Sequence, residues 1–137
     1  MEDCVFCRIA QGREWAAVVW SDEEHIAFMD RYPASRGHTL VAPKRHFRDL
    51  LEMDEEGVGR LFASVARVAK AVRRALAPAG INVLQNNGSA AGQVIFHTHV
   101  HIIPRYGNPE SIHFRSGRMR VTEEELVEVA ALIRRYL

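Results

Sequence analysis

The chain has 137 residues, enough for one domain with a hydrophobic core and too few for two ordinary ones. Its residues are 47% hydrophobic and 26% charged, as in a globular protein that folds in water. With 18 basic and 17 acidic residues the net charge is +1, which excludes the strongly basic surface that duplex nucleic acid or an anionic membrane attracts. We therefore expect no nucleic-acid or membrane partner, and we expect any phosphate group to be bound locally.

The first residues show no targeting signal. Met1 to Cys4 lack the basic region and apolar core of a signal peptide, and no apolar run reaches the about 18 residues that a membrane-spanning helix requires. These features predict a cytoplasmic protein. In a reducing compartment, Cys4 and Cys7 are expected to be a ligand or redox pair rather than a structural disulfide.

The N-terminal half predicts three short strands. Residues 17–20 and 25–29 are rich in β-branched and aromatic side chains and flank the polar turn 21–24, a pattern typical of a hairpin. After a loop, residues 38–42 predict a third strand, which Pro43 is expected to stop. No regular element is predicted before residue 17.

Two segments show helical spacing. Apolar residues recur every three or four positions after Asp54, which is the predicted N-cap of a helix that ends near Leu76, before Pro78 and Gly80. The capping-box pattern at Thr122–Glu125 predicts a second helix at the end of the chain. Residues 105–120 have little periodicity and are expected to form a loop, whose role the sequence does not reveal.

Two further strands are predicted between these helices. Residues 81–85 alternate in polarity, and residues 97–103 form a β-branched run that Pro104 is expected to end. Strands interrupted by two separate helices predict an α+β fold with an antiparallel sheet. The loop between the two strands, residues 86–93, contains two glycines and small side chains, so its backbone N–H groups can approach an anion.

The run 97–103 contains His97, His99 and His101 at every second position. In a strand these imidazoles share one face and are spaced by about 6.7 Å. A buried imidazole needs a hydrogen-bond partner for each ring nitrogen. Three histidines together therefore indicate a functional role rather than a role in core packing alone. One imidazole can attack phosphorus while a neighbour binds the phosphoryl oxygens. A catalytic metal is the alternative, although no Asp or Glu lies between Glu56 and Glu110 to complete such a site.

Cys4 and Cys7 have the two-residue spacing of half a zinc site. The remaining ligands must come from elsewhere in the chain. Candidates are His46, after the third predicted strand, and one of the clustered histidines. If His97 is a ligand, it is not available for catalysis, and the metal has a structural role in attaching the N-terminal segment to the sheet.

The histidine run resembles the signature of the histidine triad (HIT) superfamily, His-φ-His-φ-His-φ-φ with φ apolar, apart from polar Thr98 at the first φ. The resemblance covers at least residues 4–106. It continues through further matching positions, which are Asp30, residues 37–41 and 43–46, Asn86-Asn87-Gly88 and Gly92-Gln93.

This resemblance implies a single HIT domain over residues 1–137, with a core at 4–106 and a C-terminal loop and helix at 107–137. The implied architecture is an α+β HIT-like fold with an antiparallel five-stranded sheet, one long helix and a C-terminal helix. The family forms homodimers through the sheet and the long helix, and each dimer has two nucleotide sites.

The resemblance also implies roles for single residues. His99 corresponds to the nucleophile, His101 to the residue that holds phosphoryl oxygens, and His38 to a fourth histidine that hydrogen-bonds and orients the nucleophile. Asp30 corresponds to the ribose contact. The residues that match the family's phosphate cradle are Asn86, Gly92 and Gln93, and those that match the zinc site of many prokaryotic members are Cys4, Cys7, His46 and His97.

The expected function is hydrolysis at the α-phosphorus of nucleoside phosphoramidates or dinucleoside polyphosphates. A covalent nucleotidyl-histidine intermediate forms and a nucleoside monophosphate, expected to be AMP, is released. Val94 departs from the phosphoramidase branch, which commonly has a serine here that contacts the phosphate or the leaving group. The alternative is a nucleotide-binding regulatory or scaffold protein with negligible turnover.

Overall fold

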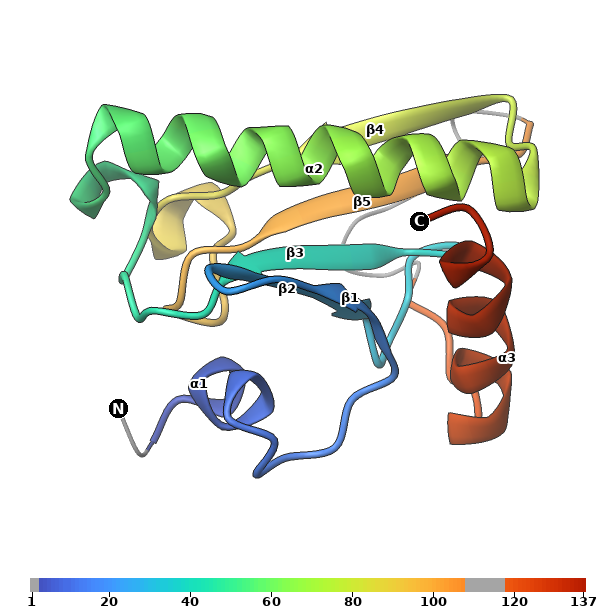
Figure 1. Cartoon of the computed structure of the whole chain (residues 1–137), viewed down its shortest axis with the longest axis horizontal. Helices are drawn as coiled ribbons and strands as arrows, with labels where there is room; N and C mark the ends of the chain where they lie inside the picture. Colours follow the sequence, from blue (N-terminus) through green and yellow to red (C-terminus); the bar gives the residue numbers. More distant parts are fainter. Residues whose placement is uncertain (1–2, 108–117) are drawn as a thin grey trace.

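The computed structural model describes residues 3–107 and 118–137 (Figure 1). Within them, five strands form one sheet in the order β1-β2-β3-β5-β4, and every neighbouring pair is antiparallel. The strands are β1 (Val18–Ser21), β2 (His25–Met29), β3 (Thr39–Pro43), β4 (Gly80–Leu84) and β5 (Val100–Arg105). This arrangement confirms the predicted α+β class and the hairpin formed by β1 and β2.

Helices cover both faces of the sheet. The long helix α2 (Glu55–Leu76) lies along one face together with α3 (Glu123–Arg134), while the short helix α1 (Val5–Ala10) lies on the other side (Figure 1). Side chains alternate between the faces along β3, because Val41 packs towards α2 and Leu40 packs with Phe6 of α1. None of the described helices is long and apolar enough to cross a membrane.

Local signals define the two longer helices. The Asp54 carboxylate accepts a hydrogen bond from the Gly57 N–H at 2.7 Å, and Ala77 ends α2 in a left-handed conformation with φ of 48°. Thr122 caps α3 through the Glu125 N–H. The buried residues of α2 follow helical spacing and include Leu61, Val65, Val68 and Val72. Both predicted N-caps are confirmed.

The predicted strand 97–103 is wrong at both ends. It begins at Val100, because the Thr98 N–H donates to the distant Phe47 carbonyl at 2.8 Å instead of to a neighbouring strand. It continues through Pro104 to Arg105. Since β3 pairs with β5 only as far as Ile102, Pro104 has one neighbouring strand, and such an edge position tolerates a residue without an N–H.

Other boundaries also differ from the predictions. Pro43 is the last residue of β3 rather than the residue after it. Helix α1, with six residues, is too short to show a periodic pattern, and it starts where the Cys4 sulfur accepts the Cys7 N–H. A short 3-10 helix at Ser89–Ala91 lies in the segment expected to be a loop, and another, at Leu50–Glu52, lies in a segment for which no element was predicted. The predicted loop 105–120 falls partly outside the described residues.

Candidate active site

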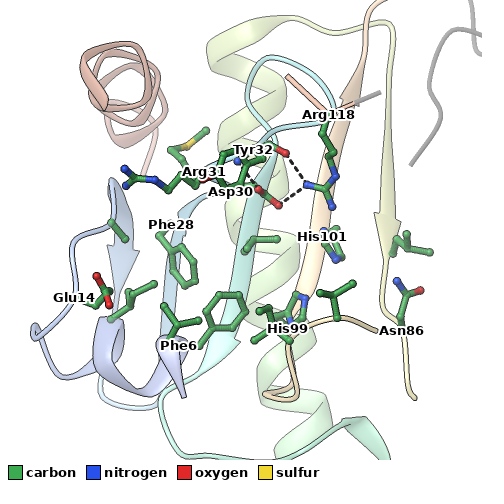
Figure 2. A pocket seen from close by; sticks show the side chains of 18 of the residues that line it. Phe6, Glu14, Phe28, Asp30, Arg31, Tyr32, Asn86, His99, His101 and Arg118 are labelled. Carbon is green, nitrogen blue, oxygen red and sulfur yellow. Dashed lines mark hydrogen bonds and ion pairs between the residues drawn. The ribbon is translucent and has the colours of Figure 1, made fainter. Parts of the chain in front are cut away.

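One pocket is lined by five of the residues predicted for catalysis and nucleotide binding (Figure 2). His101 lines it from β5, and His99 lines it from the position just before β5. Asp30, the residue after β2, also lines the pocket. Asn86 lies on the side of β4, and Phe6 of α1 lies on the opposite side (Figure 2). Sheet, helix and loop thus bring together groups that are far apart in the sequence.

The His99 ring is held in one tautomer. Its Nδ1 lies 2.7 Å from the His97 carbonyl oxygen, which can only accept a hydrogen bond, so Nδ1 carries the proton. The other nitrogen, Nε2, therefore has an available lone pair. Burial lowers the pKa of His99, which keeps the ring neutral at physiological pH. The Phe6 ring meets it edge-on at a centroid distance of 5.0 Å. These features suit a nucleophile.

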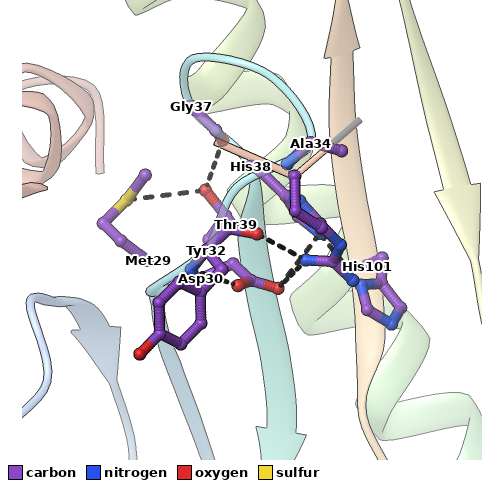
Figure 3. Close-up of polar contacts among 9 residues, drawn as sticks. Met29, Asp30, Tyr32, Ala34, Gly37, His38, Thr39 and His101 are labelled. Atoms are coloured by element: carbon purple, nitrogen blue, oxygen red, sulfur yellow. Dashed lines mark hydrogen bonds and ion pairs between the residues drawn. The ribbon is translucent and has the colours of Figure 1, made fainter. Parts of the chain in front are cut away.

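A chain of hydrogen bonds determines the tautomer of His101 (Figure 3). The Ala34 N–H donates to His38 Nδ1 at 2.9 Å, so His38 carries its proton on Nε2. That N–H donates to His101 Nδ1 at 2.9 Å, which leaves the proton of His101 on Nε2. Burial lowers the pKa of both rings to about 3. His101 is thus a neutral hydrogen-bond donor, with its ring 5.0 Å from that of His99.

The position of His38 differs from what the resemblance implies. Its hydrogen bond goes to His101, whereas the bond that orients His99 comes from the His97 carbonyl. Gly37 allows the chain to bring His38 into this buried place. It has φ of 91°, and a Cβ there would overlap the side chain of Leu76.

Asp30 supplies the carboxylate that the sequence near the histidines lacks. Its Oδ1 accepts the Tyr32 N–H at 2.9 Å, and its Oδ2 accepts from Arg118 Nη1 at 2.8 Å. Asp30, His38 and His101 have ligand-type atoms within 4.8 Å of one another, so they form a possible metal cluster. However, His38 Nε2 carries a proton in the hydrogen-bond chain described above. This arrangement favours a hydrogen-bond network over a catalytic metal site.

The loop predicted to cradle phosphate divides into two roles. Asn86 and Gly92 line the pocket. Gln93 is buried and holds the loop: its Oε1 accepts the Gly88 N–H at 2.7 Å, and its Nε2 donates to the carbonyls of Arg48 and Ile95 at 2.7 and 3.0 Å. Gln93 therefore stabilises the loop through hydrogen bonds to its backbone and does not line the pocket.

The four predicted metal ligands come together away from the pocket histidines. The ligand atoms of Cys4, Cys7, His46 and His97 all lie within 4.8 Å of one another. Cys4 Sγ is 3.3 Å from His97 Nδ1, and Cys7 Sγ is 3.4 Å from His46 Nδ1. A tetrahedral zinc ion separates a sulfur and a nitrogen ligand by about 3.5 Å, so the cluster could hold this metal.

His97 Nε2 lies 2.7 Å from the Pro43 carbonyl oxygen and must donate to it. Its Nδ1, which faces the thiols, is therefore unprotonated as a metal ligand requires. His97 thus lies with the other predicted metal ligands, while Phe6 contacts the rings of both His97 and His99. The backbone of His97 precedes β5, and its ring belongs to the cysteine cluster.

Several pocket residues were missed by the sequence analysis. Phe6, Glu14 and Trp15 come from the N-terminal segment, where no element was predicted, and Arg118 lies within the expected loop 105–120. A single aromatic or charged residue in a short helix or an irregular segment has no sequence pattern that would reveal it. Their roles follow from the fold that brings them to the pocket.

The five-stranded antiparallel sheet, the long helix and the alternating histidines His97, His99 and His101 are similar to those of histidine triad proteins. The HIT domain family model matches residues 11–108, and the chain belongs to this family.

The similarity to other proteins covers nearly the whole chain. A hypothetical histidine triad nucleotide-binding protein of Sulfolobus tokodaii has a TM-score of 0.88 and 38% identity, covering 97% of this chain and 91% of that chain. A zinc-bound histidine triad protein of Mycobacterium smegmatis has a TM-score of 0.85 and 37% identity, covering 98% and 93%. An adenylylsulfatase of Arabidopsis thaliana is 36% identical over 140 residues, 98% of this chain and 70% of that protein.

Proposed function

We propose that the protein is a nucleotide hydrolase that cleaves at the α-phosphorus through a covalent nucleotidyl-His99 intermediate. The nucleoside monophosphate that it releases is proposed to be AMP. The observation that carries this proposal is the pairing of tautomers. The unprotonated Nε2 of His99 lies on a ring 5.0 Å from the ring of His101, whose Nε2 is a donor. A nucleophile and a phosphoryl-oxygen donor are thus adjacent.

In the first step, the lone pair of His99 Nε2 attacks phosphorus. The bond from phosphorus to the departing group breaks, and its electron pair leaves with that group. In the second step, water attacks the phosphorus, the electron pair of the P–N bond returns to Nε2, and one proton of the water is released. The His101 N–H stabilises the negative charge on the phosphoryl oxygens in both steps.

The rest of the pocket suits the nucleoside part. Phe6 and Phe28 form an edge-on aromatic pair with ring centroids 5.2 Å apart, which offers an apolar wall for a base. Asp30 is proposed to accept hydrogen bonds from the ribose, and Asn86 and Gly92 to contact the phosphate. The relatives described as a nucleotide-binding protein and an adenylylsulfatase support an adenine nucleotide as substrate.

We assign structural zinc to Cys4, Cys7, His46 and His97. The donor set, the separations between ligand atoms and the zinc-bound relative support this assignment. When bound, the ion would cross-link the N-terminal segment to the segments that follow β3 and precede β5. It takes no part in the hydrolytic steps.

The proposal includes a homodimer, as the family resemblance implies. β4 is at one edge of the sheet, and its Val83 is 49% exposed, so it could pair with a second copy. Light scattering should give twice the chain mass, whereas a monomer at micromolar concentration would refute this part.

The hydrolase proposal is tested with three adenylyl compounds: adenosine 5′-phosphoramidate, diadenosine tetraphosphate and adenylyl sulfate. We expect AMP release from at least one, together with a transient gain of the AMP mass on the protein after a quench without acid. AMP binding in calorimetry without release from any compound would contradict the proposal and favour the scaffold alternative. Immediate loss of turnover on chelation, with the fold intact, would favour a catalytic metal.

A further inference from the structure

Arg118 reaches the pocket from a part of the chain that lies outside the matched HIT residues 11–108. Its Nη1 donates to Asp30 Oδ2 at 2.8 Å and to the Tyr32 carbonyl at 2.7 Å. The Asp30 carboxylate is 13% exposed and the Arg118 side chain is 29% exposed, so this ion pair is partly shielded from water. These contacts hold the Arg118 guanidinium at the pocket, where the Asp30 carboxylate offsets part of its charge.

This ion pair lies close to the histidines. Asp30 Oδ2 is 3.5 Å from His38 Nε2, and His38 in turn bonds to His101. Figure 2 shows Arg118 on the side of His101, whereas the guanidinium of Arg31 points towards the opposite end of the pocket. Arg31 pairs there with Glu123 at 3.0 Å and stacks over Trp15. Two pocket arginines therefore differ in their distance from the reacting centre.

A guanidinium recognises oxyanions particularly well. It remains charged at any physiological pH, and its planar set of N–H donors matches the oxygens of phosphate and sulfate. Val94, which also lines the pocket, has no hydrogen-bonding side chain to offer to an amine. Arg118 therefore offers N–H donors that suit a departing oxyanion, although the Asp30 carboxylate beside it offsets part of this attraction.

We propose that Arg118 positions the departing group and selects nucleotide conjugates in which that group is an oxyanion, phosphate or sulfate. This inference rests on the proposed hydrolase function. When His99 forms its bond to phosphorus, the P–O bond breaks and its electron pair goes to the departing oxygen. Arg118 stabilises the resulting anion, which needs no proton. A departing amine takes a proton instead and gains nothing from a nearby cation.

The test compares Arg118→Gln with Arg31→Gln, a matched loss of one pocket arginine. For diadenosine tetraphosphate and adenylyl sulfate, Arg118→Gln should lower kcat/KM by about 10- to 100-fold, and for adenosine 5′-phosphoramidate by less than about 3-fold. Arg31→Gln should change all three by a similar small factor. Arg118→Lys retains the charge and should preserve the discrimination better than glutamine does.

Equal losses for all three compounds would overturn the proposal, because Arg118 would then act through Asp30 on the shared nucleoside. Unchanged kinetics would overturn it as well. A binding measurement separates this from failure of the hydrolase proposal. If the wild type cleaves none of the compounds, calorimetry with ADP and AMP still applies. Arg118→Gln should weaken ADP, which carries an additional phosphate, and leave AMP unchanged; an equal effect on both refutes the role of Arg118.

Discussion

His99→Ala should abolish the covalent nucleotidyl adduct and lower kcat by at least about 10⁴-fold, as loss of a nucleophile does in other covalent enzymes. The substitution removes the one lone pair that the hydrogen bond to the His97 carbonyl keeps available. AMP binding should be largely retained, because the apolar wall, Asp30 and the phosphate loop remain. Rapid-quench mass measurement and AMP release provide the two readouts.

His25→Gln is the matched control for the loss of a buried imidazole. His25 is 3% exposed and pairs with Ser64 Oγ at 2.7 Å, outside the pocket residues. This variant should keep both the adduct and turnover. An adduct that persists in His99→Ala, or turnover within about 10-fold of wild type, would show that another group attacks phosphorus.

The pH profile gives an independent check on His99. Protonation of Nε2 removes the nucleophilic lone pair, and burial lowers the pKa of this ring below its ordinary value of 6.5. The reactive neutral form therefore persists on the acid side of 6.5. We expect the midpoint of the acid limb of kcat/KM to lie below pH 6.5. An acid limb centred above 6.5 would contradict the assignment.

Removal of zinc should lower the free energy of unfolding by about 4 kcal/mol, the value for a ligand held at 1,000 times its dissociation constant. The ion would join Cys4 and Cys7 of the N-terminal segment to His46 and His97. Calorimetry with and without a strong chelator, alongside metal analysis of the purified protein, measures the effect. At temperatures where the zinc-free protein remains folded, hydrolysis should continue, because none of the four ligands acts on substrate.

A rise in KM should accompany zinc loss. Phe6 lies between the two cysteines on α1 and packs against both Phe28 and His99, so release of α1 loosens one wall of the pocket. Cys7→Ser provides the control, since the chelator should cause no further shift in its Tm. A wild-type protein that contains no metal and has the same Tm with chelator would refute the zinc assignment.

Local patterns predicted the parts of the fold that local interactions stabilise. Helix α2 is defined by its spacing and by the Asp54 cap, and the β1–β2 hairpin by a polar turn between two apolar runs. The start of β5 could not be predicted in this way, since the N–H of Thr98 bonds to the carbonyl of Phe47. Helix α1 depends on Cys4 and on packing against the sheet.

The sequence by itself determined which chemical groups are present: an imidazole run, a cysteine pair and a glycine-containing loop, in an order that resembles the HIT superfamily. The tertiary structure decided what each group contacts. It places His97 among the cysteines, gives His101 its tautomer through His38, and brings Asp30 and Arg118 to the pocket. The tautomer and pKa of an imidazole depend on burial and on distant partners, and these exist only once the chain has folded.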